Sequence, residues 1–221
     1  MDELTMAARG NYGCPLCGNT GCTDFYRDRQ RPYRQCDQCD LVFVTNQFQL
    51  TAEAEKAVYD QHQNCPEDAG YRAFLSRLAT PLLERLAPGS KGLDFGSGPG
   101  PTLSVIFQEA GHDVALFDPY YANHPALLQA HYDFITSTEV VEHLSQPGNE
   151  LQRLWAQLKP GGYLGLMTKL VVSPEAFASW HYKNDPTHIS FFSKATFRFI
   201  GTQWGVEPQF LGDDVIIFRK A

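Results

Sequence analysis

The fold is decided by the stretch Gly92-Leu93-Asp94-Phe95-Gly96-Ser97-Gly98-Pro99-Gly100-Pro101. Its first residues, through Phe95, are predicted to end a short buried strand. A pattern of helical period then begins at Thr102 and stops at Gly111. A strand, a glycine-rich loop and a helix in this order let backbone N–H groups approach a ligand closely at the helix N-terminus. The stretch therefore predicts a nucleotide-binding loop at the start of an α/β domain.

Two kinds of nucleotide-binding loop compete for this stretch. The dinucleotide fingerprint is G-x-G-x-x-G, and Pro101 stands where its third glycine would fall. The loop instead reads G-x-G-x-G from Gly96, and Asp94 precedes it inside the strand. The next predicted strand, residues 113–117, ends in Asp118, a carboxylate that suits the binding of ribose hydroxyls. This combination resembles the class I S-adenosylmethionine-dependent methyltransferases.

The resemblance covers most of the chain after about residue 50. Residues 139–144 resemble the segment after the fourth strand of that family, and Lys159-Pro160-Gly161-Gly162 resembles the turn into its fifth strand. The resemblance implies a Rossmann-like α/β sheet closed by an antiparallel hairpin, here residues 205–211 and 215–219. It also implies S-adenosyl-L-methionine as the cofactor. The cofactor-binding residues that it implies are Asp94, Gly96, Ser97, Gly98, Gly100, Asp118, Pro119, Thr138 and Glu139.

The stretch after Asp118 departs from the family pattern. Most members carry a longer helix, a third strand and an acidic residue that binds the adenine amine. Residues 119–128 are short by comparison, and no acidic residue lies between Asp118 and Tyr132. We therefore expect backbone groups to hold the adenine.

Four of the six cysteines form two C-x-x-C pairs. Cys14 and Cys17 are separated by eighteen residues from Cys36 and Cys39, which fits a four-thiolate zinc site. Each pair presents two thiolates from a tight turn, and together they complete a tetrahedron. A closed site of this kind is structural, and a redox dithiol is the alternative. The permissive turn residues are Gly18 in the first pair and Asp40 in the second, while Cys22 and Cys65 are interpreted as small apolar residues.

The chain is predicted to contain two domains. Residues 1–48 form a zinc ribbon that is too small to hold a core without its metal. Residues 49–221 form the methyltransferase domain, with an N-terminal helical cap over residues 49–90 in which Thr51 caps the first helix. In the family such helices cover the cofactor cleft, so Tyr59, His62 and Tyr71 are candidates to face the substrate or the methionine part of the cofactor. The alternative is that Tyr71 is core and His62 is exposed.

Composition limits the partners of the chain. Its 221 residues carry a net charge of −7 and a pI near 5.4, which argues against a broad nucleic-acid-binding face. No apolar run is long enough to span a bilayer. The start, Met1-Asp2-Glu3-Leu4, lacks the basic and apolar regions of a signal peptide, so we expect a cytoplasmic protein. Its expected partner is a small-molecule acceptor, with no membrane, and the oligomeric state is left open.

The segment after the fifth strand supplies the candidate catalytic residues. Methyl transfer is an in-line displacement in which positioning does most of the work, and an oxygen or acidic carbon acceptor also needs a base. His188 is the first candidate for that base and His181 is the second. Residues 185–193 resemble a segment of zinc-containing sugar C-methyltransferases, where a histidine before an aromatic pair and a serine is the proposed base. Those enzymes carry a further large domain, so sugar specificity is not implied. The alternative is a packed His188 that bonds a backbone carbonyl.

Three functional hypotheses follow. The first is S-adenosylmethionine-dependent methyl transfer to an oxygen or carbon of a small molecule, with a structural zinc. The second is methylation of an rRNA or tRNA base, in which the ribbon grips RNA through Arg27, Arg29, Arg31 and Arg34. The sequence favours a solvated strand face as the explanation of these arginines. The third is a non-catalytic module that binds zinc and cofactor, against which the intact glycine loop and Asp118 argue. His143 is expected to have a structural or cofactor-capping role.

Overall fold

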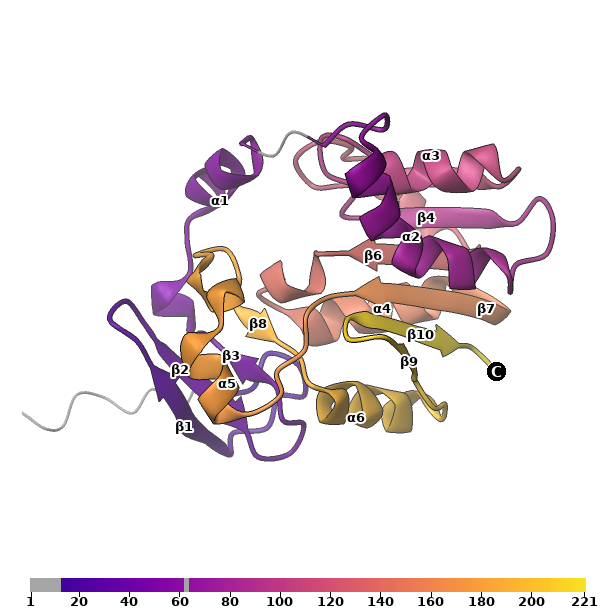
Figure 1. The fold of residues 1–221 in the computed structure, drawn as a ribbon. Helices are drawn as coiled ribbons and strands as arrows, with labels where there is room; N and C mark the ends of the chain where they lie inside the picture. Colours follow the sequence, from indigo (N-terminus) through magenta and orange to yellow (C-terminus); the bar gives the residue numbers. More distant parts are fainter. Residues whose placement is uncertain (1–12, 62–63) are drawn as a thin grey trace, which may run out of the picture.

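The structure is a computed structural model that describes residues 13–61 and 64–221. It contains a six-stranded sheet flanked by helices and, at one end, a smaller four-stranded sheet (Figure 1). His62, one of the candidates to face the substrate, lies outside the described residues. Within the described part of the chain, no helix is both long and apolar enough to cross a bilayer.

The large sheet has the strand order β5-β4-β6-β7-β10-β9. Its strands are β4 (Lys91–Phe95), β5 (Asp113–Phe117), β6 (Tyr132–Thr138), β7 (Leu158–Met167), β9 (Gln209–Leu211) and β10 (Val215–Arg219). The first four pair in parallel, and β10 pairs antiparallel with both β7 and β9. This confirms the Rossmann-like methyltransferase sheet and its closing hairpin. Where the family has a third strand, the chain forms the 3₁₀ helix η2 (Pro125–Gln129), so β5 is an edge strand.

Two pairs of helices cover the two faces of this sheet. Helices α2 (Ala69–Leu83) and α3 (Thr102–Glu109) pack on one face, where Phe107 and Phe134 belong to one cluster. Helices α4 (Pro147–Gln157) and α6 (Lys194–Trp204) pack on the other face, in a cluster that contains Ile135. Phe134 and Ile135 are neighbours on β6, and successive strand residues point to opposite faces. The buried character of β6 therefore follows from helices on both sides.

Local signals set the helix ends. Thr51 caps α1 (Ala52–Tyr59) by accepting from the backbone of Ala54, as predicted. Ser193 caps α6 in a capping box with Thr196, and the helix ends at Gly205 in the left-handed region with φ 70°. The predicted turn at residues 159–162 instead lies within β7, as an irregularity in its pairing with β6, because the chain leaves the ladder there and rejoins it at Tyr163. The remaining short elements are η1 (Asn46–Phe48), η3 (Val141–His143), α5 (Pro174–Ser179) and η4 (His181–Asn184).

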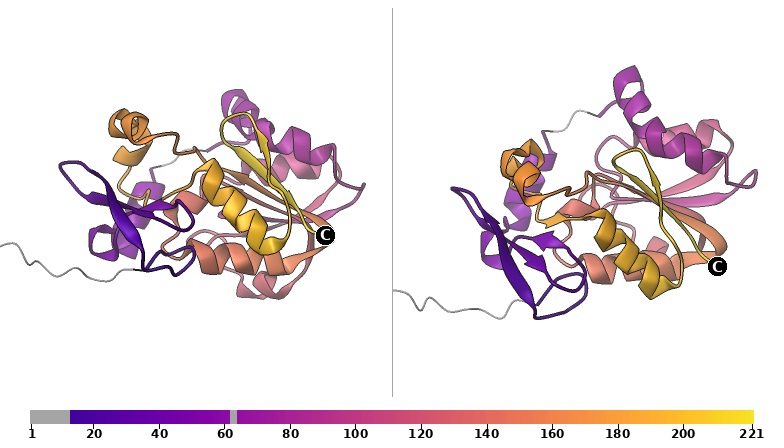
Figure 2. Two further views of the ribbon diagram at one scale, coloured as in Figure 1. Left: turned by 90° about the horizontal axis from the view of Figure 1, so that it is seen from below. Right: turned by 60° about the horizontal axis from the view of Figure 1, so that its bottom comes forward.

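The small sheet is built from two distant parts of the chain. Strands β1 (Cys22–Arg27), β2 (Pro32–Cys36) and β3 (Val42–Phe43) form the predicted ribbon. Its fourth strand is β8 (Ser190–Phe191), which pairs antiparallel with β3 and follows η4 in sequence. In both views of Figure 2 this sheet lies at the end of the molecule away from the C-terminus. The limits 1–48 and 49–221 stay a prediction, but β8 ties the ribbon to the segment that contains His188.

Candidate active site

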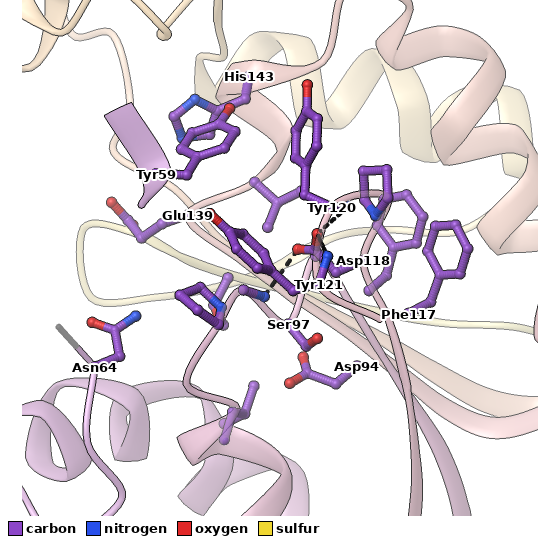
Figure 3. A pocket seen from close by; sticks show the side chains of 18 of the residues that line it. Tyr59, Asn64, Asp94, Ser97, Phe117, Asp118, Tyr120, Tyr121, Glu139 and His143 are labelled. Atoms are coloured by element: carbon purple, nitrogen blue, oxygen red, sulfur yellow. Dashed lines mark hydrogen bonds between the residues drawn. The ribbon is translucent and has the colours of Figure 1, made fainter. Parts of the chain in front are cut away.

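A cavity of about 850 Å³ opens at the carboxyl ends of β4, β5 and β6. Open α/β sheets bind ligands at this edge. The nine residues predicted to bind the cofactor all line it: Asp94, Gly96, Ser97, Gly98, Gly100, Asp118, Pro119, Thr138 and Glu139. Figure 3 shows several of these side chains converging on one space. The structure therefore brings the predicted cofactor residues together.

The glycine loop has the geometry of a close backbone approach. Gly96 and Gly98 have φ of 79° and 63°, the left-handed region that other residues seldom adopt. A Cβ on Gly100 would lie 2.3 Å from the carbonyl oxygen of Asn64, so only glycine allows the backbone at Asn64 to pack this closely against the loop. A Cβ on Gly98 would meet no atom of the described residues within 4 Å. At Gly98 a side chain would therefore take up cavity space without clashing with the protein.

Asp118 is held by the backbone rather than by a cation. Its Oδ2 accepts a hydrogen bond from the N–H of Gly98 at 3.0 Å. Its Oδ1 accepts from the N–H groups of Tyr120 and Tyr121, at 2.8 and 3.1 Å (dashed in Figure 3). A carboxylate has about four acceptor sites, so roughly one is left for a ligand hydroxyl. The side chain is thus fixed in place by the backbone of the protein itself.

Asp94 lies beneath the loop as a buried acid. Only 3% of it is exposed, and Thr136 Oγ1 donates to its Oδ1 at 3.0 Å. Burial raises the pKa of Asp94 from 3.8 to about 7, and the negative charge of Asp118 adds to the rise. A buried carboxylate costs free energy when ionised, so this residue makes the stability of the fold depend on pH.

We expect Asp94→Asn to remove that dependence. Between about pH 4 and pH 7 the unfolded chain releases the Asp94 proton while the folded chain keeps it, so wild-type stability falls as pH rises. A pKa rise from 3.8 to about 7 corresponds to at most roughly 4 kcal/mol. Urea unfolding should show the wild type losing up to about that much relative to Asp94→Asn between pH 4 and pH 8. Asp113→Asn, at an exposed carboxylate, is the control, and an equal pH trend in Asp94→Asn and wild type would contradict the assignment.

Helix α1 forms one wall of the cavity and is joined to the loop after β5 by hydrogen bonds between tyrosine hydroxyls and carboxylates. The Glu55 carboxylate accepts hydrogen bonds from the hydroxyls of Tyr59 and Tyr120, each at 2.8 Å. Tyr121 donates to Asp60 at 2.7 Å, which adds a second link between α1 and the loop after β5. The ring of Tyr59 meets His143 edge-on, with centroids 5.3 Å apart (Figure 3). Tyr59 and Tyr71, two of the candidates to face the substrate, both line the cavity.

The structure separates the two candidate bases. His188 lines the cavity with only 8% of its surface exposed, and burial lowers its pKa, so the ring is neutral near pH 7. Its Nδ1 lies 2.7 Å from the carbonyl oxygen of Tyr182, and its Nε2 lies 3.8 Å from the Asp185 carboxylate. His188 therefore both packs on a backbone carbonyl and faces the cavity. His181 is exposed, contacts Lys169 at 3.4 Å, and does not belong to the described lining of the cavity.

Sequence reasoning missed a buried acidic group beside His188. Glu142 is completely buried, and its carboxylate accepts a hydrogen bond from the hydroxyl of Tyr182, which also lies 3.3 Å from Glu139 Oε2. Glu139 has φ of 53°, which is uncommon outside glycine and turns its side chain into the cavity end of β6. The signal available in the sequence was the group Glu139, Glu142 and His143 directly after a buried strand. Charged residues are costly to bury, so their presence there indicates a functional site.

Arg31 connects the ribbon to the loop that carries His188. Its guanidinium donates to the carbonyl oxygens of Lys183, Asp185 and His188 at 2.9 Å each, and to that of Pro186 at 3.0 Å. Only 4% of Arg31 is exposed, so it does not belong to a solvated face. Arg34 likewise donates inward, to the carbonyl of Cys22, whereas Arg27 and Arg29 are exposed. The four ribbon arginines therefore do not form one free basic surface.

The four paired cysteines meet at one point. Their sulfur atoms all lie within 4.8 Å of one another, with Cys14–Cys39 and Cys17–Cys36 each at 3.5 Å. Sulfurs around a tetrahedral zinc with bonds near 2.3 Å are separated by roughly 3.8 Å, so the cluster has suitable dimensions. Gly18 and Asp40 have φ of 75° and 58°, which confirms their predicted role as permissive turn residues.

The sheet and the glycine loop define a Rossmann-like methyltransferase fold. A family model described as a methyltransferase domain matches residues 68–207, more than half of the chain, and the protein belongs to this family. No curated protein sequence matches it.

Two solved structures show the same fold. One is 1,6-didemethyltoxoflavin-N1-methyltransferase from Burkholderia thailandensis, with bound 1,6-didemethyltoxoflavin and S-adenosylhomocysteine. It is 18% identical, with a TM-score of 0.52 over 89% of this chain and 98% of that chain. The other is magnesium protoporphyrin IX methyltransferase from Synechocystis PCC 6803, with bound SAH. It is 15% identical, with a TM-score of 0.52 over 80% of this chain and 97% of that chain. At these identities the likeness concerns the fold alone.

Proposed function

We propose that this protein transfers a methyl group from S-adenosylmethionine to an oxygen or carbon atom of a small-molecule acceptor. The observation that carries the proposal is the single cavity lined by the glycine loop, by Asp118 and by His188. The first two supply the expected cofactor contacts, and the third supplies a neutral imidazole. Membership of the methyltransferase family supports the cofactor assignment.

The residues of the chain divide the work between binding and proton removal. The cofactor, when bound, supplies an electrophilic methyl group on a sulfonium. The glycine loop, whose backbone can approach the ligand closely, and the carboxylate of Asp118 would orient it. His188 is neutral at neutral pH, and its Nδ1 faces the Tyr182 carbonyl, so Nε2 carries the lone pair that can take a proton from the acceptor. Tyr59 and the rest of α1 limit the access of water on the side of the cavity that they line.

A small acceptor fits the site better than RNA does. The cavity of about 850 Å³ is within the usual range for small-ligand sites, about 300–1,000 Å³. The net charge of −7 and the inward contacts of Arg31 and Arg34 leave the ribbon poorly suited to bind phosphates. Both fold neighbours are named for small-molecule acceptors, which supports the same choice.

The four-cysteine cluster is proposed to hold one structural zinc ion. Four thiolates at these separations match the donor set and geometry that zinc prefers. Such a closed site has no open position for substrate, so its contribution is to hold the ribbon together. Through β8 and Arg31, the ribbon in turn holds the loop of His188.

The cofactor assignment is tested by calorimetry with S-adenosylhomocysteine on wild type and Gly98→Val. The valine side chain would occupy the space that the cofactor needs, so we expect affinity to fall by at least about tenfold, or 1.4 kcal/mol. Gly89→Val is the matched control, because Gly89 also has positive φ (70°) and open space but lies outside the described lining of the cavity. Equal affinity in the two variants would place the cofactor elsewhere.

A further inference from the structure

Glu142, His143 and His188 bring one carboxylate and two imidazoles together: the two histidines line the cavity, and Glu142 is completely buried beside them. One ligand atom from each residue lies within 4.8 Å of the other two. The rings of His143 and His188 meet edge-on, with centroids 4.7 Å apart. Glu142 and His143 come from η3, and His188 comes from the loop before β8, so the fold joins residues that are far apart in sequence.

Both imidazoles have their tautomer set by the backbone. His143 Nδ1 lies 3.2 Å from the carbonyl oxygen of Thr187, and His188 Nδ1 lies 2.7 Å from that of Tyr182. A carbonyl oxygen only accepts hydrogen bonds, so each Nδ1 carries the proton and each Nε2 carries the lone pair. Histidines that bind metal ions are oriented in this way, with the second ring nitrogen donating to a carbonyl or carboxylate.

The buried carboxylates lack the partners that their burial requires. Glu142 Oε2 and Glu139 Oε1 are both buried and have no hydrogen-bond partner among the described residues. Their other oxygens share the hydroxyl of Tyr182, which has a single proton to donate. No ion pair of the described residues involves either glutamate. Buried carboxylates are normally hydrogen-bonded, paired or bound to a metal ion, so these two oxygens are available to a cation.

We propose that Glu142, His143 and His188, with Glu139 beside them, bind one divalent transition-metal ion of the Mn²⁺ type. Two imidazoles and a carboxylate form a donor set that first-row divalent ions accept, with coordination positions left open. Ligand atoms on opposite sides of such an ion are about 4.2 Å apart, and the three ligand atoms here lie within 4.8 Å of one another, so the cluster has the dimensions of a metal site.

The site would select an oxygen acceptor. This step rests on the proposed function, because it assumes that a methyl acceptor enters the same cavity. A hydroxyl that occupies an open position of the ion has a lowered pKa and loses its proton more easily. Glu139, which lines the cavity and has an unpartnered oxygen, is placed to receive that proton. In this arrangement His188 acts by holding the ion rather than by taking the proton itself.

The test is a titration of the full chain with Mn²⁺, with the cysteine site left intact. Electron paramagnetic resonance measures the Mn²⁺ that stays free in solution. Wild type should bind one Mn²⁺ per chain without cofactor or acceptor. Glu142→Gln, which keeps the shape of the side chain, and His143→Ala should each weaken binding by at least roughly tenfold. Glu150→Gln is the matched control, since it removes a carboxylate that lines the same cavity and pairs with Arg153, and it should bind like wild type.

The alternatives give different results. Absence of Mn²⁺ binding in wild type, or equal binding in all variants, overturns the site; the latter places the ion on other side chains. Calorimetry with S-adenosylhomocysteine on the same samples keeps the two proposals apart. If the cofactor binds and Mn²⁺ does not, only the metal site falls. If Mn²⁺ binds with the expected variant pattern and the cofactor does not, the metal site stands and the proposed function falls.

Discussion

Cys36→Ser is expected to release the zinc ion that we propose for the ribbon and to unfold the small sheet. Structural zinc sites contribute roughly 10–16 kcal/mol of binding free energy, as much as the whole stability of many domains, about 5–15 kcal/mol. Cys36 ends β2 and is completely buried, so loss of its thiolate removes both a ligand and a packed side chain. Zinc content measured by elemental analysis should fall from one ion per chain to well below one.

The effect should reach beyond the ribbon. Taken alone, the sequence favours a ribbon that can be lost while the α/β domain stays folded. In the structure, however, β8 pairs with β3, and Arg31 donates hydrogen bonds to four carbonyl oxygens within residues 183–188. Hydrogen exchange should therefore accelerate in residues 181–191 as well as in the ribbon.

Cys22→Ser is the matched control for this prediction. Cys22 lies in β1 beside the cluster, but its sulfur contacts the carbonyl oxygen of Asn19 at 3.6 Å and it does not belong to the four-cysteine group. It should keep its zinc and its exchange pattern. Wild-type protein purified without chelator that contains no zinc would contradict the site directly. Unchanged exchange in residues 181–191 of Cys36→Ser would show that the ribbon does not hold the loop of His188.

Local sequence patterns were sufficient to predict which residues meet at the proposed cofactor-binding edge of the sheet. The glycine loop, Asp118 and the helix that starts at Thr102 all lie within one strand–loop–helix–strand unit, where spacing alone determines what meets. The four cysteines were equally accessible, because two short pairs with left-handed turn residues carry their geometry within a few positions. In both cases the chemistry depends on residues that are near one another in sequence.

The wall of the cavity that would face the acceptor could not be derived in the same way. Strand β8 has two residues, too few for a periodic pattern, and its partner β3 belongs to the ribbon. Arg31 reads from the sequence as one of four solvated arginines, and only the tertiary structure places carbonyl oxygens around it. Glu142 is completely buried by elements that arrive much later in the chain. Such contacts arise from long-range packing, which one sequence does not encode locally.

His188→Ala is expected to lower turnover by roughly 10² to 10⁴ while cofactor affinity stays close to wild type. That range is the usual contribution of a positioned base. The residues proposed to bind the cofactor lie on other loops, and His188 touches none of them through a hydrogen bond in the described structure. The measurement is release of S-adenosylhomocysteine, screened over phenols, hydroxy acids and 1,3-dicarbonyl compounds and then quantified with the best acceptor. Calorimetry on the same variant gives the cofactor affinity.

Two comparisons separate a functional His188 from a merely structural one. His181→Ala should react at the wild-type rate, because its exposed ring lies outside the described lining of the cavity. If His188 only packs against Tyr182, His188→Ala should lower the melting temperature and leave the rate per folded molecule unchanged. Its Nδ1 contact with the Tyr182 carbonyl makes some loss of stability certain in either case, so the rate is the deciding quantity. The ring of His188 lines the cavity and carries a lone pair on Nε2, which gives that rate a reason to fall, whether the nitrogen takes the proton or holds the ion that lowers the pKa of the acceptor.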